Sequence, residues 1–404
     1  LYLLPEKVTK RCNNLILFGV SWSFLPQRKS VKTGIEEYQK FLLTPNCNIS
    51  MRKSILVSLA VLFAAVVAVG CKRSPKNKEY VYDVYVAGWE REDPMLWKNG
   101  EPTKLPQKDE GSVATAVFVS GNDVYVAGLE SVYYGAQDQE NPTRYVGAFW
   151  KNGVVSRFTD LAGKADGIEI NGLFVSGSDV YVVGQDKFGE EPTAMLWKNG
   201  IAEPLSDGSK SAYANSVFVS GNDVYVAGSY DGVALWKNKI LSKYTNDSHS
   251  GARSVFVSGN DVYVAGWDSQ SATLWKNGVA EKLTDGSNPA SARSVFVSGN
   301  DIYVVGSARR GSKVVATLWT KRGESGSWES KNLTDGSRDA YASSIYVIDN
   351  HIYIAGYEEK ENSPLDIAML WTKAPDSDTW EAKKLTNGED MAKAYSVYAV
   401  KREK

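Results

Sequence analysis

The sequence predicts an all-β protein, a seven-bladed β-propeller built from four-stranded blades. Three observations support this prediction: a segment close to SVFVSGNDVYVAG recurs along the chain, a segment close to LWKNG follows each copy, and the copies recur about every 45 residues. Units of this length cannot bury their apolar faces alone and must pack on their neighbours. The tyrosine of VYVAG recurs as Tyr85, Tyr125, Tyr181, Tyr225, Tyr263, Tyr303 and Tyr353.

Each unit contains four short segments that are rich in β-branched and aromatic residues and end at turn signals. In the fifth unit they cover residues 254–258, 262–266, 272–275 and 279–283. The Gly259-Asn260 step suits a two-residue hairpin, which would pair Phe256 with Tyr263 and Val257 with Val262. Both faces of such a sheet are apolar, so we expect it to lie between two neighbouring sheets, as a propeller blade does.

The two ends of the repeat array complement each other. The first unit begins near Val81 with its second strand, whereas the C-terminal segment 395–400 has the pattern of a first strand. We therefore predict that this segment completes the first blade, so that the first blade is closed by the C-terminal strand. Closure removes open sheet edges, which invite aggregation. The predicted propeller domain covers residues 81–404.

An export signal precedes this domain. Met51-Arg52-Lys53 is followed by an apolar run over 55–69, too short for a comfortable membrane span, and the run ends in Ala68-Val69-Gly70-Cys71, which resembles a bacterial lipobox. We predict a lipoprotein signal peptide at 51–70 and a lipidated Cys71 with a polar tether over 71–80. The alternatives are a plain signal peptide or an uncleaved anchor helix. A signal peptide begins a protein, so we interpret residues 1–50 as an upstream extension from a start assigned too early.

Composition narrows the possible functions. The formal net charge is −1, with 43% hydrophobic and 23% charged residues, values that argue against disorder and against a nucleic-acid partner. All three cysteines precede the repeats, and the two histidines, His249 and His351, stand in no catalytic or metal-binding motif. The Asp-Gly turns lack the further acidic ligands of a calcium loop. We therefore expect a monomer with no cofactor, no metal and no identifiable catalytic residue.

One face of the predicted propeller varies between units. The loops between second and third strands differ in length, and loops of this kind on a rigid scaffold usually determine binding specificity. The longest is expected over residues 129–147. Three aromatic residues, Trp89, Trp267 and Tyr357, follow the glycine of VYVAG on this face and suit a glycan or protein partner. Alternatively, Trp89 and Trp267 simply cover blade edges.

A second variable feature is the residue three positions before the aromatic of each inner strand, at the expected mouth of the central channel. Arg253 and Arg293 lie in adjacent blades and could hold a carboxylate, a sulfate or a uronic acid. The alternative is that both are solvated residues at strand starts. We predict a binding surface made of Arg253, Arg293, Asn171, Asn215 and Tyr395 together with Trp89, Trp267 and Tyr357; the remaining members of the ring are Thr115 and Ser343.

Two known repeat families carry related motifs. VSGNDVYVAG resembles the bacterial seven-bladed β-propeller repeat with its G-N-x-Y-V-x-G core, and ATLWKNGVAEKLTDGS is similar to the extracellular HAF repeat. The resemblance covers residues 81–400 and implies a propeller fold and export. Neither family has a motif for a defined reaction.

These observations leave three functional hypotheses. The leading one is a non-enzymatic lipoprotein of the bacterial cell envelope, anchored at the outer membrane or cell surface, whose variable face binds a glycan or protein. The first alternative is a propeller glycosidase or polysaccharide lyase, with Arg253 and Arg293 holding an acidic sugar. Such a glycosidase needs two carboxylates about 5–10 Å apart beside these arginines. The second alternative is a scaffold subunit of an envelope assembly, which would present a large apolar patch.

Overall fold

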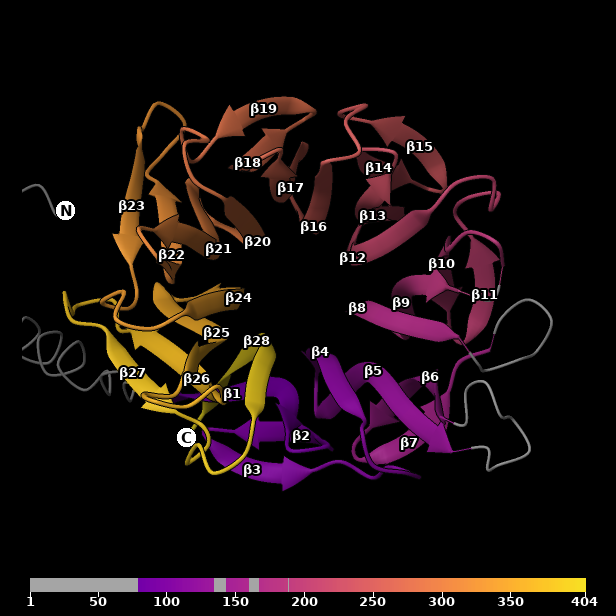
Figure 1. Ribbon diagram of the computed structural model, residues 1–404, viewed down its shortest axis with the longest axis horizontal. Coiled ribbons are helices and arrows are strands. Elements are labelled where there is room, and N and C mark those ends of the chain that lie inside the picture. Colours follow the sequence, from indigo (N-terminus) through magenta and orange to yellow (C-terminus); the bar gives the residue numbers. More distant parts are fainter. Residues whose placement is uncertain (1–78, 134–142, 160–166, 188) are drawn as a thin grey trace, which may run out of the picture. The chain divides into compact units, whose positions relative to one another are not determined.

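The computed structural model describes residues 79–133, 143–159, 167–187 and 189–404. Residues 1–50, the predicted signal peptide and Cys71 lie outside the described residues. All regular elements in the described part of the chain are strands, arranged as seven antiparallel four-stranded sheets around a central axis (Figure 1). This arrangement confirms the predicted seven-bladed β-propeller.

Within each blade the strands follow one another from the axis outward. Blade 1 has β28 (Ala392–Glu403), β1 (Tyr80–Glu90), β2 (Asp93–Lys98) and β3 (Glu101–Lys104). Blade 2 has β4 (Val113–Ser120), β5 (Asp123–Tyr133), β6 (Thr143–Lys151) and β7 (Val154–Arg157). Blade 3 has β8 (Ile168–Ser176), β9 (Asp179–Asp186), β10 (Thr193–Lys198) and β11 (Ile201–Pro204). Blade 4 has β12 (Ala212–Ser220), β13 (Asp223–Tyr230), β14 (Val233–Lys237) and β15 (Ile240–Lys243).

The remaining three blades follow the same order. Blade 5 has β16 (Ser250–Ser258), β17 (Asp261–Asp268), β18 (Ser271–Lys276) and β19 (Val279–Lys282). Blade 6 has β20 (Ala290–Ser298), β21 (Asp301–Arg310), β22 (Lys313–Lys321) and β23 (Trp328–Asn332). Blade 7 has β24 (Ala340–Ile348), β25 (His351–Glu359), β26 (Asp366–Lys373) and β27 (Glu381–Lys384).

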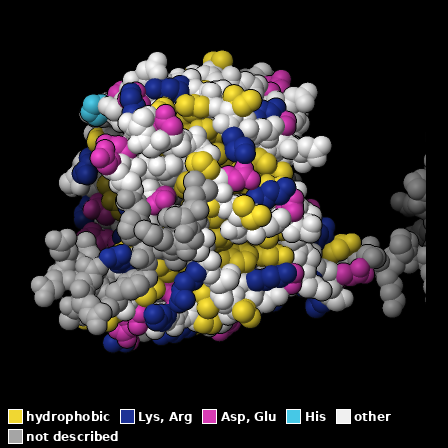
Figure 2. Space-filling model, turned by 90° about the vertical axis from the view of Figure 1, so that its right-hand side faces the viewer, with side chains coloured by type: hydrophobic (Ala, Val, Ile, Leu, Met, Phe, Trp, Pro, Cys, Tyr) yellow, Lys and Arg dark blue, Asp and Glu magenta, His cyan; other side chains and the backbone are white. Residues whose placement is uncertain are grey.

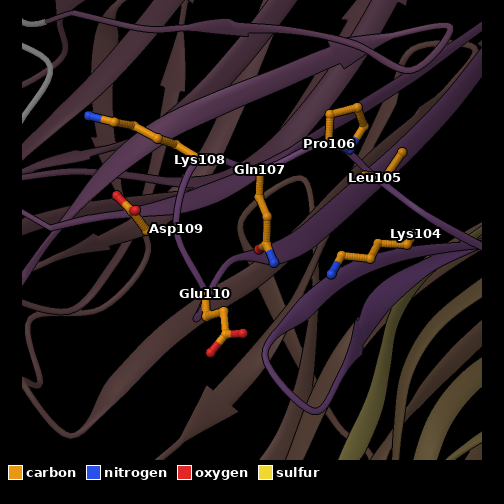
Figure 3. Close-up of a pocket in the computed structure, with 7 residues that line it drawn as sticks. All are labelled: Lys104, Leu105, Pro106, Gln107, Lys108, Asp109 and Glu110. Carbon is orange, nitrogen blue, oxygen red and sulfur yellow. The ribbon is translucent and has the colours of Figure 1, made fainter.

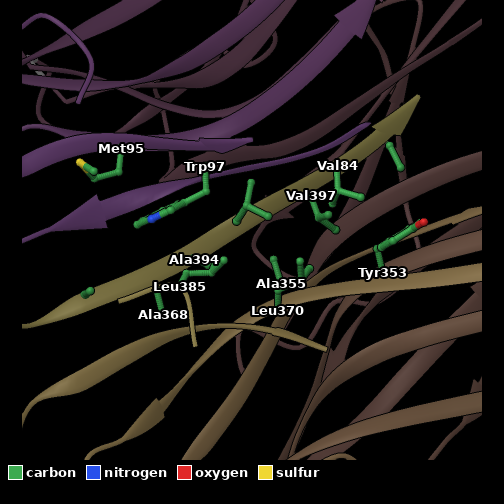
Figure 4. Packing of buried hydrophobic residues seen from close by; sticks show 13 residues of the cluster. Val84, Met95, Trp97, Tyr353, Ala355, Ala368, Leu370, Leu385, Ala394 and Val397 are labelled. Atoms are coloured by element: carbon green, nitrogen blue, oxygen red, sulfur yellow. The ribbon is translucent and has the colours of Figure 1, made fainter. Parts of the chain in front are cut away.

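The C-terminal strand closes the ring as predicted. β28 pairs antiparallel with β1 over eleven positions, from Tyr80 opposite Glu403 to Glu90 opposite Ala392. Figure 1 shows β28 beside β1 and facing β24 of the last blade. Trp97, Leu370 and Val397, from three different strands, meet in the core between blades 7 and 1 (Figure 4). The first and last blades are thus joined by both backbone hydrogen bonds and a hydrophobic core.

Each blade buries one large tryptophan against its neighbour. The tryptophan of the LWKNG segment is at most 1% exposed in every blade. Removing so large a buried side chain typically costs about 3–5 kcal/mol, so these residues contribute heavily to each seam between blades. They are Trp97, Trp150, Trp197, Trp236, Trp275, Trp319 and Trp371.

Hairpin register follows the sequence prediction, but the inner strands begin earlier than predicted. Phe256 pairs with Tyr263 and Val257 with Val262, as expected. β16, however, starts at Ser250 rather than at 254, because pairing continues after a β-bulge between Ala252 and Ser254. A bulge leaves one residue unpaired and redirects its side chain. The bulge leaves Arg253 unpaired, and all seven blades carry a bulge at the equivalent position.

The bulge also explains the glycine of VYVAG. The bulged strand brings its backbone so close to Gly266 that a Cβ there would collide with the carbonyl oxygen of Gly251. Gly228 stands in the same relation to Tyr213, and the equivalent glycine does so in the other blades. Only glycine lacks the Cβ that would clash, which accounts for its recurrence in every repeat.

The ring has two distinct faces. We call the face with the bulges and the loops between second and third strands the bulge face. The opposite face, which carries the turns between first and second strands and between third and fourth strands, is the turn face.

The loop predicted over 129–147 is shorter than expected, because β5 and β6 extend the hairpin and pair Leu129 with Gly147 and Tyr133 with Thr143.

Candidate functional site

The seven residues predicted to ring the channel mouth are the seven bulge residues. Three of them, in consecutive blades, bind the next blade. Thr115 Oγ1 donates to the carbonyl oxygen of Ile170 at 3.0 Å, and Asn171 Nδ2 donates to that of Ala214 at 3.0 Å. Asn215 Nδ2 donates to the carbonyl oxygen of Ala252 at 2.7 Å. Asn171 and Asn215, predicted as binding residues, therefore have their amides engaged in the seams between blades.

Serines supply a second type of hydrogen bond across the seams. The residue after the bulge is a serine in five blades, and its hydroxyl accepts a hydrogen bond from a backbone N–H of the next blade at 3.2–3.3 Å. Blades 2 and 3 have Ala116 and Gly172 at this position. Their seams are joined instead by Thr115 and Asn171. Each seam thus has at least one hydrogen bond from a side chain at or beside the bulge.

The other four bulge residues form no such bond to the next blade, and two of them are arginines. The Arg253 guanidinium lies over the Trp267 ring, 5.1 Å from its centroid, and the Arg293 guanidinium lies 5.4 Å from the centroid of Tyr341. Neither arginine forms an ion pair or hydrogen bond with the described part of the chain. Their charges therefore remain available for a ligand, while the aromatic rings restrict their orientation.

Two effects lower the pKa of Arg253 below its ordinary value. The larger is the loss of water around its guanidinium group within the surrounding protein, and the smaller is repulsion by the positive charge of Arg293. An arginine stays protonated at neutral pH in proteins. An anion placed between the two guanidinium groups would relieve this repulsion and accept charge-assisted hydrogen bonds.

A cavity of about 340 Å³ lies beside Arg253 and Arg293, and the sequence did not reveal two of its key residues. Arg309, at the end of β21, adds a third cation, and Tyr341 from β24 adds an aromatic wall. Arg309 Nη1 donates to the carbonyl oxygen of Ser312 at 3.2 Å. The lining consists of Arg253, Trp267, Pro289, Ala290, Ser291, Arg293, Ser307, Arg309, Val314 and Tyr341, with no carboxylate among them.

Aromatic residues continue from this cavity towards blade 1. Tyr341 stacks on Tyr357 with centroids 4.9 Å apart, and Tyr357 meets Tyr395 edge-on at 6.5 Å. Trp89 Nε1 donates to the Tyr395 hydroxyl at 3.2 Å. Tyr357 is only 8% exposed, so most of its ring packs against neighbouring side chains and little of it is accessible to a partner. Trp89 and Tyr395 are half-buried on the bulge face.

One carboxylate near this path, Asp366, already has a cationic partner. Asp366 pairs with Lys393 at 3.1 Å, and the Lys393 ammonium lies 4.6 Å from the Tyr357 centroid. Burial raises the pKa of Tyr357 and keeps its hydroxyl neutral. The two carboxylates required beside the arginines for glycoside hydrolysis are thus not present in the lining of this cavity. No cluster of three or more potential metal ligands occurs in the described ranges.

Another hollow, of about 480 Å³, lies far from these residues in the sequence. It is lined by one continuous segment, Lys104–Glu110, between blades 1 and 2. Figure 3 shows Lys108 and Asp109 pointing away from Lys104 and Gln107, and the last two both contact Oδ1 of Asp93 at 2.6 Å. It includes none of the residues predicted from the sequence. We regard it as the outline of a connecting loop.

Comparisons with known proteins assign no family and no function to this chain. No family model and no curated protein matches the chain. A computationally designed protein, Ika8, matches with a TM-score of 0.42 and 18% identity over 67% of this chain and 76% of that one. The WD40 β-propeller domain of Doa1 matches with a TM-score of 0.46 and 11% identity over 74% of this chain and 95% of that one. The fold is compatible with a binding role.

Proposed function

We propose that this protein is a non-enzymatic envelope lipoprotein whose bulge face binds an acidic glycan. The observation that carries the proposal is the cavity beside Arg253 and Arg293, where cations without carboxylate partners stand against aromatic rings. A glycan that carries carboxylate or sulfate groups presents both features that such a cavity recognises. Its anionic groups accept hydrogen bonds from guanidinium, and its apolar ring faces pack on aromatic side chains.

The cavity lies beside bulge residues that form no hydrogen bond to the next blade, and this position supports the proposal. Blades 2 to 4 use their bulge residues to hold neighbouring blades together, so their polar groups are engaged. Blades 5 and 6 place Arg253 and Arg293 at the same positions without such bonds. The guanidinium groups of Arg253 and Arg293 therefore remain available for a partner, because no hydrogen bond between blades uses them.

The absence of a carboxylate from the cavity lining favours binding over hydrolysis. A glycosidase of the usual kind needs an acid and a second carboxylate at the scissile bond. A polysaccharide lyase is the alternative function, because a lyase does not need this pair of carboxylates. Turnover of the bound acidic glycan would identify it.

The experiment is a glycan array probed with the 79–404 domain and with the double variant Arg253→Ala/Arg293→Ala. We expect wild-type domain to bind carboxylated or sulfated glycans and the double variant to lose that binding. A matched control is Lys282→Ala/Lys331→Ala, which removes two positive charges from exposed positions on outer strands. Equal binding by the wild type and the arginine variant would reject this site.

Anchoring through Cys71 is a separate part of the proposal and needs its own test. Cells that express the full chain would be fed a clickable fatty acid. The label should appear on the wild-type protein and be absent from Cys71→Ser. Label retained in Cys71→Ser, or absent from both proteins, would reject lipidation at this cysteine without affecting the glycan site.

A further inference from the structure

Exposed large hydrophobic side chains gather at one end of the strands. Nine such residues occur in the described part of the chain, and seven lie where strands begin on the turn face. Figure 2 shows hydrophobic side chains reaching the surface of the outer wall between charged ones. The seven are Tyr80, Val81, Val154, Ile201, Ile240, Leu241 and Val279.

Four of them occupy one repeated position in four consecutive blades. Val154, Ile201, Ile240 and Val279 begin the outer strands of blades 2 to 5, each paired with the lysine of the LWKNG segment, and are 69–73% exposed. In blades 1, 6 and 7 the residues at this register position are Glu101, Glu329 and Glu381, all exposed. The fold therefore accepts a charge here. Packing within a blade does not explain the aliphatic residues.

We call Val154, Ile201, Ile240 and Val279 the aliphatic arc. The charged side chains beside this arc form ion pairs with one another. Lys151 pairs with Asp123 at 2.9 Å, and Lys198 pairs with Asp179 at 2.9 Å. Lys237 pairs with Asp223 at 2.8 Å. The arc thus presents aliphatic tips among neutralised charges, which suits an apolar or zwitterionic surface better than an anionic one.

The chain enters the propeller on the same face. β1 begins at Tyr80 on the turn face, where the backbone N–H of Lys404 donates to the carbonyl oxygen of Glu79 at 3.0 Å. Cys71 precedes Glu79 by eight residues, which span at most about 28 Å in any conformation. From Tyr80 to Glu90, β1 alone rises about 33 Å from the turn face to the bulge face. A lipid on Cys71 can therefore bring the turn face to a bilayer, but it cannot bring the bulge face there.

From these observations we infer that the aliphatic arc of blades 2 to 5 rests on a lipid bilayer and that the bulge face points away from it. This orientation rests on the proposed anchor at Cys71. Four separate side chains bury too little area to hold the protein on a bilayer by themselves. The contact therefore orients a protein that is already anchored, and leaves the arginine cavity open to glycans outside the membrane.

The test uses the 79–404 domain, which forms a compact unit of its own and contains no cysteine. An N-terminal histidine tag on nickel-chelating lipid in phosphatidylcholine vesicles replaces the acyl anchor, so the result does not depend on lipidation of Cys71. A polarity-sensitive fluorophore is attached at Ile240→Cys. Matched labels are placed at Glu381→Cys, the equivalent position in blade 7, and at Asn288→Cys in the connection before β20.

We expect spin-labelled lipid to quench the fluorophore at residue 240 several-fold more than at residue 288, with residue 381 in between. The variant Val154→Glu/Ile201→Glu/Val279→Glu, which copies the glutamates of blades 1, 6 and 7, should reduce quenching at residue 240 and keep the native circular dichroism spectrum. Equal quenching at residues 240 and 288 would overturn the inference. A label at residue 240 that is shielded only in a dimer would overturn it as well, since a second copy would then cover the arc.

Discussion

The side-chain amide of Asn215 bonds the carbonyl oxygen of Ala252, the residue immediately before Arg253 in the next blade, at 2.7 Å. Asn215 and Arg253 occupy the same bulge position in adjacent blades. One of them holds a seam together, and the other lies over Trp267 beside a cavity. Some bulge residues therefore stabilise the seams between blades, whereas others are available to a ligand.

Substitution at these two positions should separate the two roles. Asn215→Ala leaves the Ala252 carbonyl without its partner and should lower the free energy of unfolding by about 1 kcal/mol. Arg253→Ala removes no hydrogen bond and should change that free energy by less than about 0.5 kcal/mol. Urea denaturation of both variants gives the comparison. A larger loss for Arg253→Ala than for Asn215→Ala would contradict the division.

The bulge glycine provides a second prediction. Gly266→Ala places a Cβ against the carbonyl oxygen of Gly251, and the bulge must shift to accept it. We expect the free energy of unfolding to fall by about 1–3 kcal/mol or more. Gly189→Ala is the control, because a Cβ there meets no heavy atom closer than 3.3 Å. If the two variants melt at the same temperature, the close approach at the bulge does not govern stability.

Acid should weaken the turn face. The hydrogen bond from Lys237 lowers the pKa of Asp223 below its ordinary value of 3.8, and Asp123, Asp179 and Asp261 repeat this arrangement with their own lysines. Because the folded-state pKa is the lower one, the stabilising contribution is full above the ordinary range. It is lost as the pH falls from about 5 through 3.8 towards the folded values.

The measurement is the melting temperature between pH 3 and pH 6, in wild type and in a variant with asparagine at all four aspartates. Wild type should melt at progressively lower temperature as the pH falls. The variant should show a shallower dependence, because it has lost the groups that become protonated. An identical slope in both proteins would mean that other carboxylates control acid unfolding.

Removal of the C-terminal strand should open the ring. Truncation after Met391 deletes β28, which exposes the edge of β1 and the core around Trp97. We expect aggregation or loss of a cooperative melting transition. A synthetic 392–404 peptide added in trans should restore the transition. A truncated domain that stays monomeric and melts like wild type would contradict closure by this strand.

Most of the fold could be predicted because its signals are local and repeated. The hairpin register of Phe256 and Tyr263 and the closure by the C-terminal strand follow from turn residues and from counting strands. The bulge was missed because it depends on backbone pairing across two strands. Its sequence signal is the invariant glycine of VYVAG, together with the variable residue at the bulge.

The candidate site was only partly predictable. Arg253 and Arg293 stood out because otherwise similar repeats differ at that position. Arg309 and Tyr341 were missed because they reach the cavity from an extended hairpin and from a neighbouring blade, which no linear spacing reveals. Asn171 and Asn215 looked the same as the arginines in sequence. Only the structure shows that the two asparagines differ from the arginines, because their side chains form hydrogen bonds to the next blade.

The most direct test of the arginine cavity is calorimetric titration of the 79–404 domain with a uronic acid oligosaccharide chosen from the array. Its carboxyl-reduced neutral form and the Arg253→Ala/Arg293→Ala variant serve as comparisons. We predict binding of the acidic form that weakens with salt, and at least a tenfold loss, about 1.4 kcal/mol, on reduction of the sugar or removal of the arginines. Equal affinity for acidic and reduced sugars, or for wild type and variant, would contradict the account.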